Sequence, residues 1–235
     1  MLSIWIGRAG SGKSALVLET IQRERENRPQ LLLVPEHTSH EAELDLCRFC
    51  GPTACRSTEV LTFQSLATRV LGETGGLADV TLDNGGKLLT MRRCLQELHT
   101  QLKVFGRPSQ RSAFLHQLTT LADEFYAYQI APETLYRHVE DMEGAMGDKL
   151  RDVALIFAAY DAKLRHGGTD TRSRVQKLHD SLPQSHYLDG KDLYLDGFSF
   201  FNKQEESVLA LALRRCASVT VTLLGDKTGQ QFQNA

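Results

Sequence analysis

The sequence lacks any apolar run near the roughly 20 residues that a membrane-spanning helix needs, so we expect no association with membranes. It also lacks an excess of basic charge, because 27 Lys and Arg stand against 29 Asp and Glu, for a formal net charge of −2. No overall positive field draws the chain to nucleic acid, and any DNA contact has to be local. The N-terminus shows no basic region followed by a cleavage site, so a signal peptide is not expected.

The cysteine content does not indicate a disulfide framework. The five cysteines are Cys47, Cys50, Cys55, Cys94 and Cys216. An odd number in a chain of this length favours reduced thiols in a cytoplasmic protein over a disulfide framework. Low-complexity segments and internal repeats are absent as well. The last eight residues carry no closing cap after an apparent strand, which suggests a fragment of a longer protein.

A phosphate-binding loop is the most specific motif present. The pattern G-x-x-x-x-G-K-S lies directly after the apolar residues 2–6 and before a helical segment, residues 15–26. Its backbone N–H groups and the helix N-terminus would surround phosphates, Lys13 would reach the outer phosphates, and the Ser14 hydroxyl would help hold Mg²⁺. The predicted ATP-binding residues are Gly7, Arg8, Ala9, Gly10, Ser11, Gly12, Lys13 and Ser14.

Apolar runs and helical periodicity define the predicted fold. We expect strands at residues 2–6, 31–34, 59–63, 192–195 and 219–224, with the first strand buried on both faces. Helical patterns cover residues 39–49 and 65–71, then 87–102, 114–128 and 149–165 in a long stretch with few strand signals. Asp170 can cap a further helix that runs to Leu182, and Asn202 with Glu205 forms a reciprocal cap.

These segments predict an α/β fold of the P-loop NTPase type, with a parallel sheet and helices on both faces, interrupted by an all-helical insertion. Residues 1–84 and 186–235 would form the discontinuous sheet domain, and residues 85–185 the insertion.

A second Mg²⁺ ligand is expected at the end of a neighbouring strand, and Asp196 is the best candidate because it follows residues 193–195. The alternative is a surface aspartate that starts a turn. Many such motifs place glutamate directly after the aspartate to activate water, but here that position is Gly197. The sequence therefore predicts nucleotide binding more strongly than turnover.

Several segments in order resemble superfamily-one DNA helicases: residues 34–36, 61–67, 194–198 and 224–226. Over essentially the whole chain, the sequence more closely resembles the N-terminal part of the B subunit of the bacterial AddAB-type helicase–nuclease. The resemblance implies a longer protein that pairs with an A-type subunit, acts on single- and double-stranded DNA, and resects double-strand breaks for recombinational repair. It places an iron–sulfur cluster only in a C-terminal part beyond this sequence.

The resemblance also assigns residues. Thr62, Phe63 and Gln64 match the segment that contacts single-stranded DNA, although Phe63 fits a core position nearly as well. His37 replaces a glutamine that is usual after Pro35 and Glu36, so the reading of a DNA signal could differ in this chain.

Two further residues follow from the resemblance. Asp226 and Gln230 occupy positions that couple the nucleotide state to DNA, with one extra residue before the glutamine.

Alternatives remain at this stage. A stand-alone P-loop kinase would explain the loop, but the insertion has no arginine cluster and residues 62–64 would have no role. A nucleotide-stabilised scaffold is the non-enzyme alternative. A zinc site from His37, His40, Cys47, Cys50 and Cys55 is disfavoured, because residues 39–49 are expected to be helical, with His40 and Cys47 on different faces; buried or incidental thiols are the better account.

Overall fold

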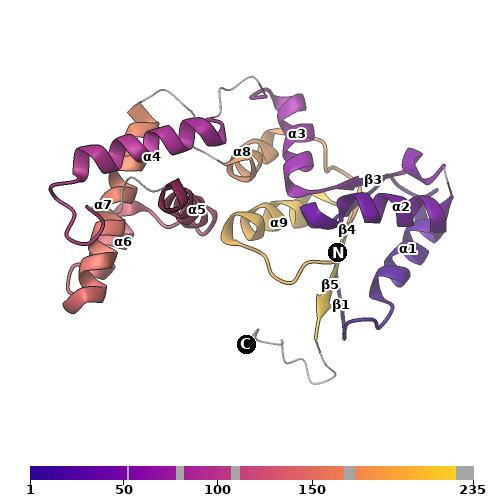
Figure 1. Cartoon of the computed structure of the whole chain (residues 1–235). Helices are drawn as coiled ribbons and strands as arrows, with labels where there is room; N and C mark the ends of the chain where they lie inside the picture. The colour runs from indigo at the N-terminus through magenta and orange to yellow at the C-terminus, as the bar shows by residue number, and fades with distance from the viewer. Residues whose placement is uncertain (52, 78–81, 107–111, 167–172, 226–235) are drawn as a thin grey trace. The chain divides into compact units, whose positions relative to one another are not determined.

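The computed structural model describes residues 1–51, 53–77, 82–106, 112–166 and 173–225 (Figure 1). The chain divides into two compact units, one formed by Met1–Leu77 and Arg174–Ala235 and the other by Ala78–Ser173. The first unit contains the sheet and the phosphate loop, and the second is helical. Each unit is described by itself.

Five parallel strands form the sheet of the first unit: β1 (Leu2–Gly7), β2 (Gln30–Leu33), β3 (Thr58–Leu61), β4 (Asp192–Leu195) and β5 (Ser218–Leu224). Their order across the sheet is β1-β5-β4-β2-β3. The predicted α/β fold with a parallel sheet is confirmed. Because all described strands are parallel, every loop that follows a strand leaves from the same edge of the sheet, called the carboxyl edge below.

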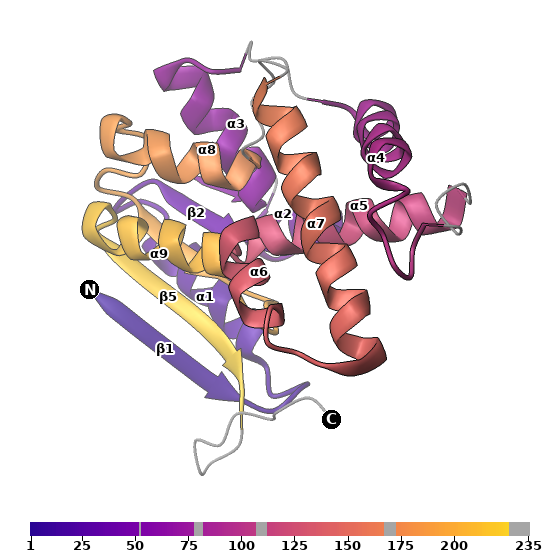
Figure 2. The ribbon, with the colours of Figure 1, turned by 90° about the vertical axis from the view of Figure 1, so that its left-hand side faces the viewer.

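Helices cover both faces of this sheet (Figures 1 and 2). On one face, α1 (Lys13–Glu24) and α2 (Ser39–Cys50) pack through Val17, Ile21 and Leu46 onto Leu32 and Tyr194. We call this the α1 face. The other face carries α3 (Phe63–Thr74), α8 (Arg174–Ser181) and α9 (Lys203–Arg215), which share a larger apolar core with alternate residues of β2, β4 and β5.

The second unit is built from α4 (Asn84–Leu98), α5 (Ser112–Ala127), α6 (Pro132–Val139) and α7 (Gly144–His166). Met91 and Leu95 of α4, Leu118 of α5, and Phe157 and Tyr160 of α7 lie in its buried core. Three predicted helices of this stretch are therefore present, and α6 is a helix that the sequence interpretation did not include.

The boundaries of this unit differ from the expected insertion at residues 85–185. The helix α8 belongs to the sheet unit, because Val175 and Leu178 lie in the core formed with α3 and α9. Asp170, the predicted cap of that helix, lies outside the described residues. Within the described ranges, no helix is both long enough and apolar enough to cross a membrane.

The prediction that β1 is buried on both faces is wrong. β1 lies at the end of the sheet order, paired with β5, and its residues Leu2, Ile4 and Ile6 are 48%, 51% and 54% exposed. Trp5 points the other way and packs against the core of the α1 face. An apolar sequence alone could not reveal this, because a run of aliphatic residues does not specify which strands lie beside it.

Two local predictions have different outcomes. The reciprocal cap is confirmed, because the Asn202 side chain accepts from the Glu205 N–H at 3.0 Å and the Glu205 carboxylate accepts from the Asn202 N–H at 2.9 Å. The third strand, however, ends at Leu61 rather than at residue 63. Thr62 caps α3 and Phe63 is its first residue.

Candidate functional site

The phosphate loop connects β1 to α1 and has the backbone that its glycines allow. Gly10 and Gly12 have positive φ angles of 72° and 84°, in the left-handed region that other L-residues enter only at a cost. The Lys13 ammonium folds over the loop, donating to the carbonyl oxygens of Gly7 at 2.9 Å and Arg8 at 2.8 Å. The lysine is therefore held at the loop by main-chain acceptors.

The N-terminus of α1 has the features of an anion site. The helix begins at Gly12 without a side-chain cap, and its first turn holds no acidic residue. Gly10, Gly12 and Ser14 are exposed to solvent. Uncapped N–H groups, the positive end of the helix dipole and a nearby ammonium together suit a phosphate group, so the residues present fit a bound nucleotide.

Asp196 follows β4 at the same carboxyl edge as the loop. Its N–H donates to the Leu33 carbonyl of β2 at 3.1 Å, and its carboxylate accepts a hydrogen bond from the Thr222 hydroxyl of β5 at 2.5 Å. Successive residues of a strand alternate between faces, so Asp196 shares a face with Tyr194, which packs in the core under α1 and α2. Asp196 is thus on the α1 face, the face whose helix carries Lys13 and Ser14.

Gly197 has a structural reason to be glycine. Its φ of +81° lies in the left-handed region, and an added Cβ would meet the Pro35 ring at 3.4 Å. That distance is an ordinary van der Waals contact, so a glutamate in this position would be disfavoured by the strain of the left-handed backbone. The departure from the helicase pattern that the sequence interpretation noted is therefore built into the turn after Asp196.

The residues assigned to DNA contact lie at the other end of the carboxyl edge. His37 is exposed in a short 3-10 helix at Glu36–Thr38, after β2, and Gln64 is exposed in the first turn of α3, after β3. Strands are about 4.8 Å apart, so the four steps from β1 to β3 separate the phosphate loop from the start of α3 by about 19 Å along the sheet.

Thr62 and Phe63 have internal partners instead. The Thr62 hydroxyl accepts from the Ser65 N–H at 3.2 Å and the Ser65 hydroxyl accepts from the Thr62 N–H at 2.7 Å, which completes a capping box. Phe63 is 5% exposed and packs edge-on against Phe198, with ring centroids 5.7 Å apart. Base stacking by Phe63 stays a prediction, and it would need a ring face that this packing covers.

The remaining candidates fall into two groups. Asp226 and Gln230 lie outside the described residues, although Gly225 just before them donates to the Gly7 carbonyl at 3.2 Å and so lies beside the loop. In the part of the chain that the structure describes, no three His, Cys, Asp or Glu side chains are placed to hold a metal ion. A nucleotide-bound Mg²⁺ does not need such a cluster, because one hydroxyl, one carboxylate, phosphate oxygens and water complete its shell.

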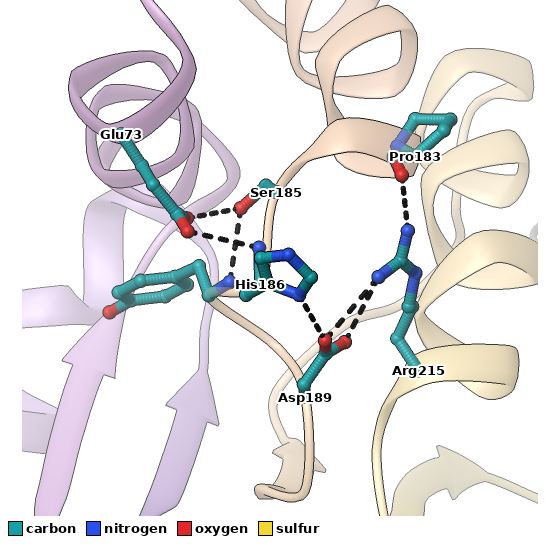
Figure 3. Close-up of polar contacts among 7 residues, drawn as sticks. Glu73, Pro183, Ser185, His186, Asp189 and Arg215 are labelled. Carbon is teal, nitrogen blue, oxygen red and sulfur yellow. Dashed lines mark hydrogen bonds and ion pairs between the residues drawn. The ribbon is translucent and has the colours of Figure 1, made fainter.

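A polar cluster that sequence reasoning missed joins the segment before β4 to α3 and α9 (Figure 3). The Ser185 hydroxyl and the His186 N–H both donate to Glu73, while the His186 ring and Arg215 contact Asp189 at 2.8 Å and 3.2 Å. The hydrogen bond from Ser185 is the main cause that lowers the pKa of Glu73.

A serine, a histidine and an aspartate here suggest a hydrolytic triad, but the geometry argues against one. Ser185 donates to Glu73 rather than to the ring of His186, so the histidine is not placed to take the hydroxyl proton. The cluster instead anchors the chain that enters β4. Because its partners are up to 113 residues apart in sequence, no local pattern could have identified it.

Comparisons of the sequence with known proteins bear on its family. The family model described as "ADDB, N-terminal" matches residues 4–235. Among curated relatives, the B subunit of the ATP-dependent helicase/deoxyribonuclease of Geobacillus thermodenitrificans is 34% identical over 96% of this chain and 20% of its own length. Proteins with the same description are 33% identical in Clostridium botulinum and 32% in Clostridium tetani, covering 95% and 97% of this chain and 20% and 21% of theirs.

The chain therefore spans about a fifth of the length of the curated relatives it matches. Family membership gives the stand-alone kinase hypothesis no support. With the family model covering nearly every residue, the chain belongs to the AddB N-terminal family.

Proposed function

We propose that this chain binds ATP with Mg²⁺ at the phosphate loop. The observation that carries the proposal is the placement of Asp196, which lies at the same sheet edge and on the same sheet face as the start of α1. Residues 7–14 would enclose the phosphates with their N–H groups, Lys13 would neutralise the outer phosphates, and Ser14 with Asp196 would hold Mg²⁺. When bound there, Mg²⁺ would supply positive charge that offsets the repulsion between the phosphates.

Hydrolysis by this chain alone would be slow or undetectable. Turnover needs a group that orients or deprotonates water beside the metal-side aspartate. The next residue is Gly197, and Glu205 on the following helix uses its carboxylate to cap α9. Nucleotide binding without efficient turnover suits a regulatory or structural use of ATP.

The names of the relatives support a wider proposal. Each is the B subunit of an ATP-dependent helicase/deoxyribonuclease, so we infer that the parent of this chain works in a DNA-repair helicase–nuclease together with an A-type subunit. Within it, this chain would contact single-stranded DNA near His37 and Gln64, at the β2 and β3 end of the carboxyl edge. Resection of double-strand breaks, and an iron–sulfur cluster in the C-terminal part, would belong to the larger protein.

The nucleotide proposal is tested by thermal melting with and without ATP and MgCl₂. We expect ATP with Mg²⁺ to raise Tm, since a ligand that binds only the folded state stabilises it. Lys13→Ala should abolish the shift. Arg23→Ala is the matched control, because it removes an exposed cation from the last turn of the same helix, about 15 Å along the axis. A wild-type chain that shows no shift would refute nucleotide binding.

A further inference from the structure

The hydrogen bond between Thr222 and Asp196 has a role beyond joining two strands. We propose that Thr222 is a positioning residue that fixes the Asp196 carboxylate for Mg²⁺, an inference that rests on the nucleotide-binding function proposed above. Thr222 is 3% exposed, and its hydroxyl donates to Asp196 Oδ1 at 2.5 Å. A carboxylate only accepts hydrogen bonds, so the threonine proton is committed to this contact.

Strand register explains why this threonine is the residue in place. β5 lies between β4 and β1, and Thr222 pairs with Trp5, two residues before Gly7 of the loop. The hydroxyl therefore lies between the strand that carries Asp196 and the strand that leads into the phosphate loop. The structure gives Asp196 Oδ2 no hydrogen-bond donor among the described residues, so one oxygen is fixed while the other stays available to a cation.

The amino-terminal ends of β4 and β5 hold a similar hydroxyl–carboxylate pair, which can be compared with Thr222 and Asp196. There, four residues earlier on each strand, the Ser218 hydroxyl donates to Asp192 Oδ1 at 2.6 Å, and Arg28 pairs with the same carboxylate oxygen at 3.5 Å. Asp192 thus has both a hydroxyl and a cation from the protein. Asp196 has the hydroxyl, but no Lys, Arg or His in the described ranges forms an ion pair with it. A cation from outside the protein completes the same arrangement at the carboxyl edge.

Fixing one oxygen matters because a freely rotating carboxylate loses conformational entropy when it binds a metal ion, and this loss lowers the affinity for the metal. Removing a hydrogen-bond partner of a metal ligand typically weakens metal binding by about 10–100-fold. Thr222→Val keeps the branched shape that suits a strand and removes the hydroxyl. We expect this variant to need about 10–100-fold more Mg²⁺ for half of the ATP-dependent stabilisation, with Thr222→Ser close to wild type.

The experiment titrates MgCl₂ into the 235-residue chain at fixed ATP and records Tm. Ser218→Ala is the matched control, because it removes the same kind of contact from the edge away from the loop, and its Mg²⁺ midpoint should not move. Thr222→Ala is a second variant without the hydroxyl, and both Thr222 variants are compared with wild type in ATP with EDTA. A role in general folding would change Tm in every condition, whereas positioning shifts only the Mg²⁺ midpoint.

The outcomes separate this inference from the function it rests on. If the wild type shows no stabilisation by ATP and Mg²⁺, the nucleotide proposal fails. If the wild type responds and Thr222→Val or Thr222→Ala has the wild-type Mg²⁺ midpoint, Thr222 does not position Asp196. A midpoint shift of the same size in Ser218→Ala would also overturn the inference, because it would show a general effect of the strand pair.

Discussion

Replacing Phe63 with alanine tests whether this ring belongs to the core or stacks on a DNA base. The side chain is 5% exposed and packs edge-on against Phe198 in the core under α3 and α9. Truncating a buried phenylalanine costs about 3–5 kcal/mol of stability. For a chain of 235 residues each kcal/mol lowers Tm by about 2–4 °C, so we expect a decrease of about 6–20 °C.

Alanine alone cannot test DNA binding, since a destabilised chain loses affinity for a trivial reason. Phe63→Leu keeps an apolar side chain and removes the aromatic pair, worth about 0.5–1.5 kcal/mol. Phe198→Leu removes the same pair from the other side, together with the contact to Phe201, and is the control. Gln64→Ala changes the exposed neighbour at the start of α3. Melting is followed by circular dichroism, and binding by the fluorescence anisotropy of labelled oligothymidylate at several salt concentrations.

The core interpretation predicts that both leucine variants melt slightly below wild type and bind the oligonucleotide equally well, while Gln64→Ala weakens binding. It is refuted if Phe63→Ala melts like the wild type. It is also refuted if Phe63→Leu stays folded and loses affinity by about 5- to 150-fold while Phe198→Leu does not, because a stacked base contributes about 1–3 kcal/mol.

Two further predictions concern the turn after β4 and the cap of α9. Gly197→Glu should destabilise the fold by about 1–2 kcal/mol in urea melts, because of its left-handed backbone. Gly190→Glu, with φ of +70° and open space around its Cβ, has the same backbone cost and should destabilise the fold equally; a much smaller loss at Gly197 would argue against backbone strain there. Burial raises the pKa of Glu205 above its ordinary 4.5, so the folded state holds the proton more tightly and stability falls as pH rises through the raised value. Glu205→Gln keeps an acceptor for Asn202 and should flatten that pH dependence in denaturant titrations; an unchanged slope would contradict it.

Local patterns in the sequence predict the parts of this structure that depend on neighbouring residues. The strands were predicted because short apolar runs lie between turn residues, and the Asn202 cap because its partner stands three positions later. The edge position of β1 could not be predicted, since strand order depends on contacts between distant segments. The same limit applies to Phe63, whose place in a helix is fixed by the Thr62 capping box and whose burial is fixed by Phe198.

In the candidate site, too, contiguous motifs could be predicted and contacts between distant residues could not. The loop could be predicted because its motif is contiguous, whereas the hydroxyl of Thr222 lies 26 residues from Asp196 and carries no motif. Likewise, the sequence showed that Gly197 replaces a glutamate but gave no cause. The cause is the left-handed backbone of Gly197, in a turn that lies against Pro35, a residue distant in sequence.

The contacts around Asp196 also connect the two ends of the carboxyl edge. Its carboxylate is held by Thr222 of β5, the strand beside the phosphate loop, while its N–H bonds to Leu33 of β2, the strand that leads to His37. Gly197 then lies against Pro35, one residue before that 3-10 helix. Asp196 is therefore bonded toward the phosphate loop through its side chain and toward the expected DNA-contact residues through its backbone, as the proposed function requires of a metal-side aspartate. The left-handed backbone at Gly197 disfavours a glutamate after Asp196, so under the function proposed above the site would hold nucleotide without a glutamate there to activate water.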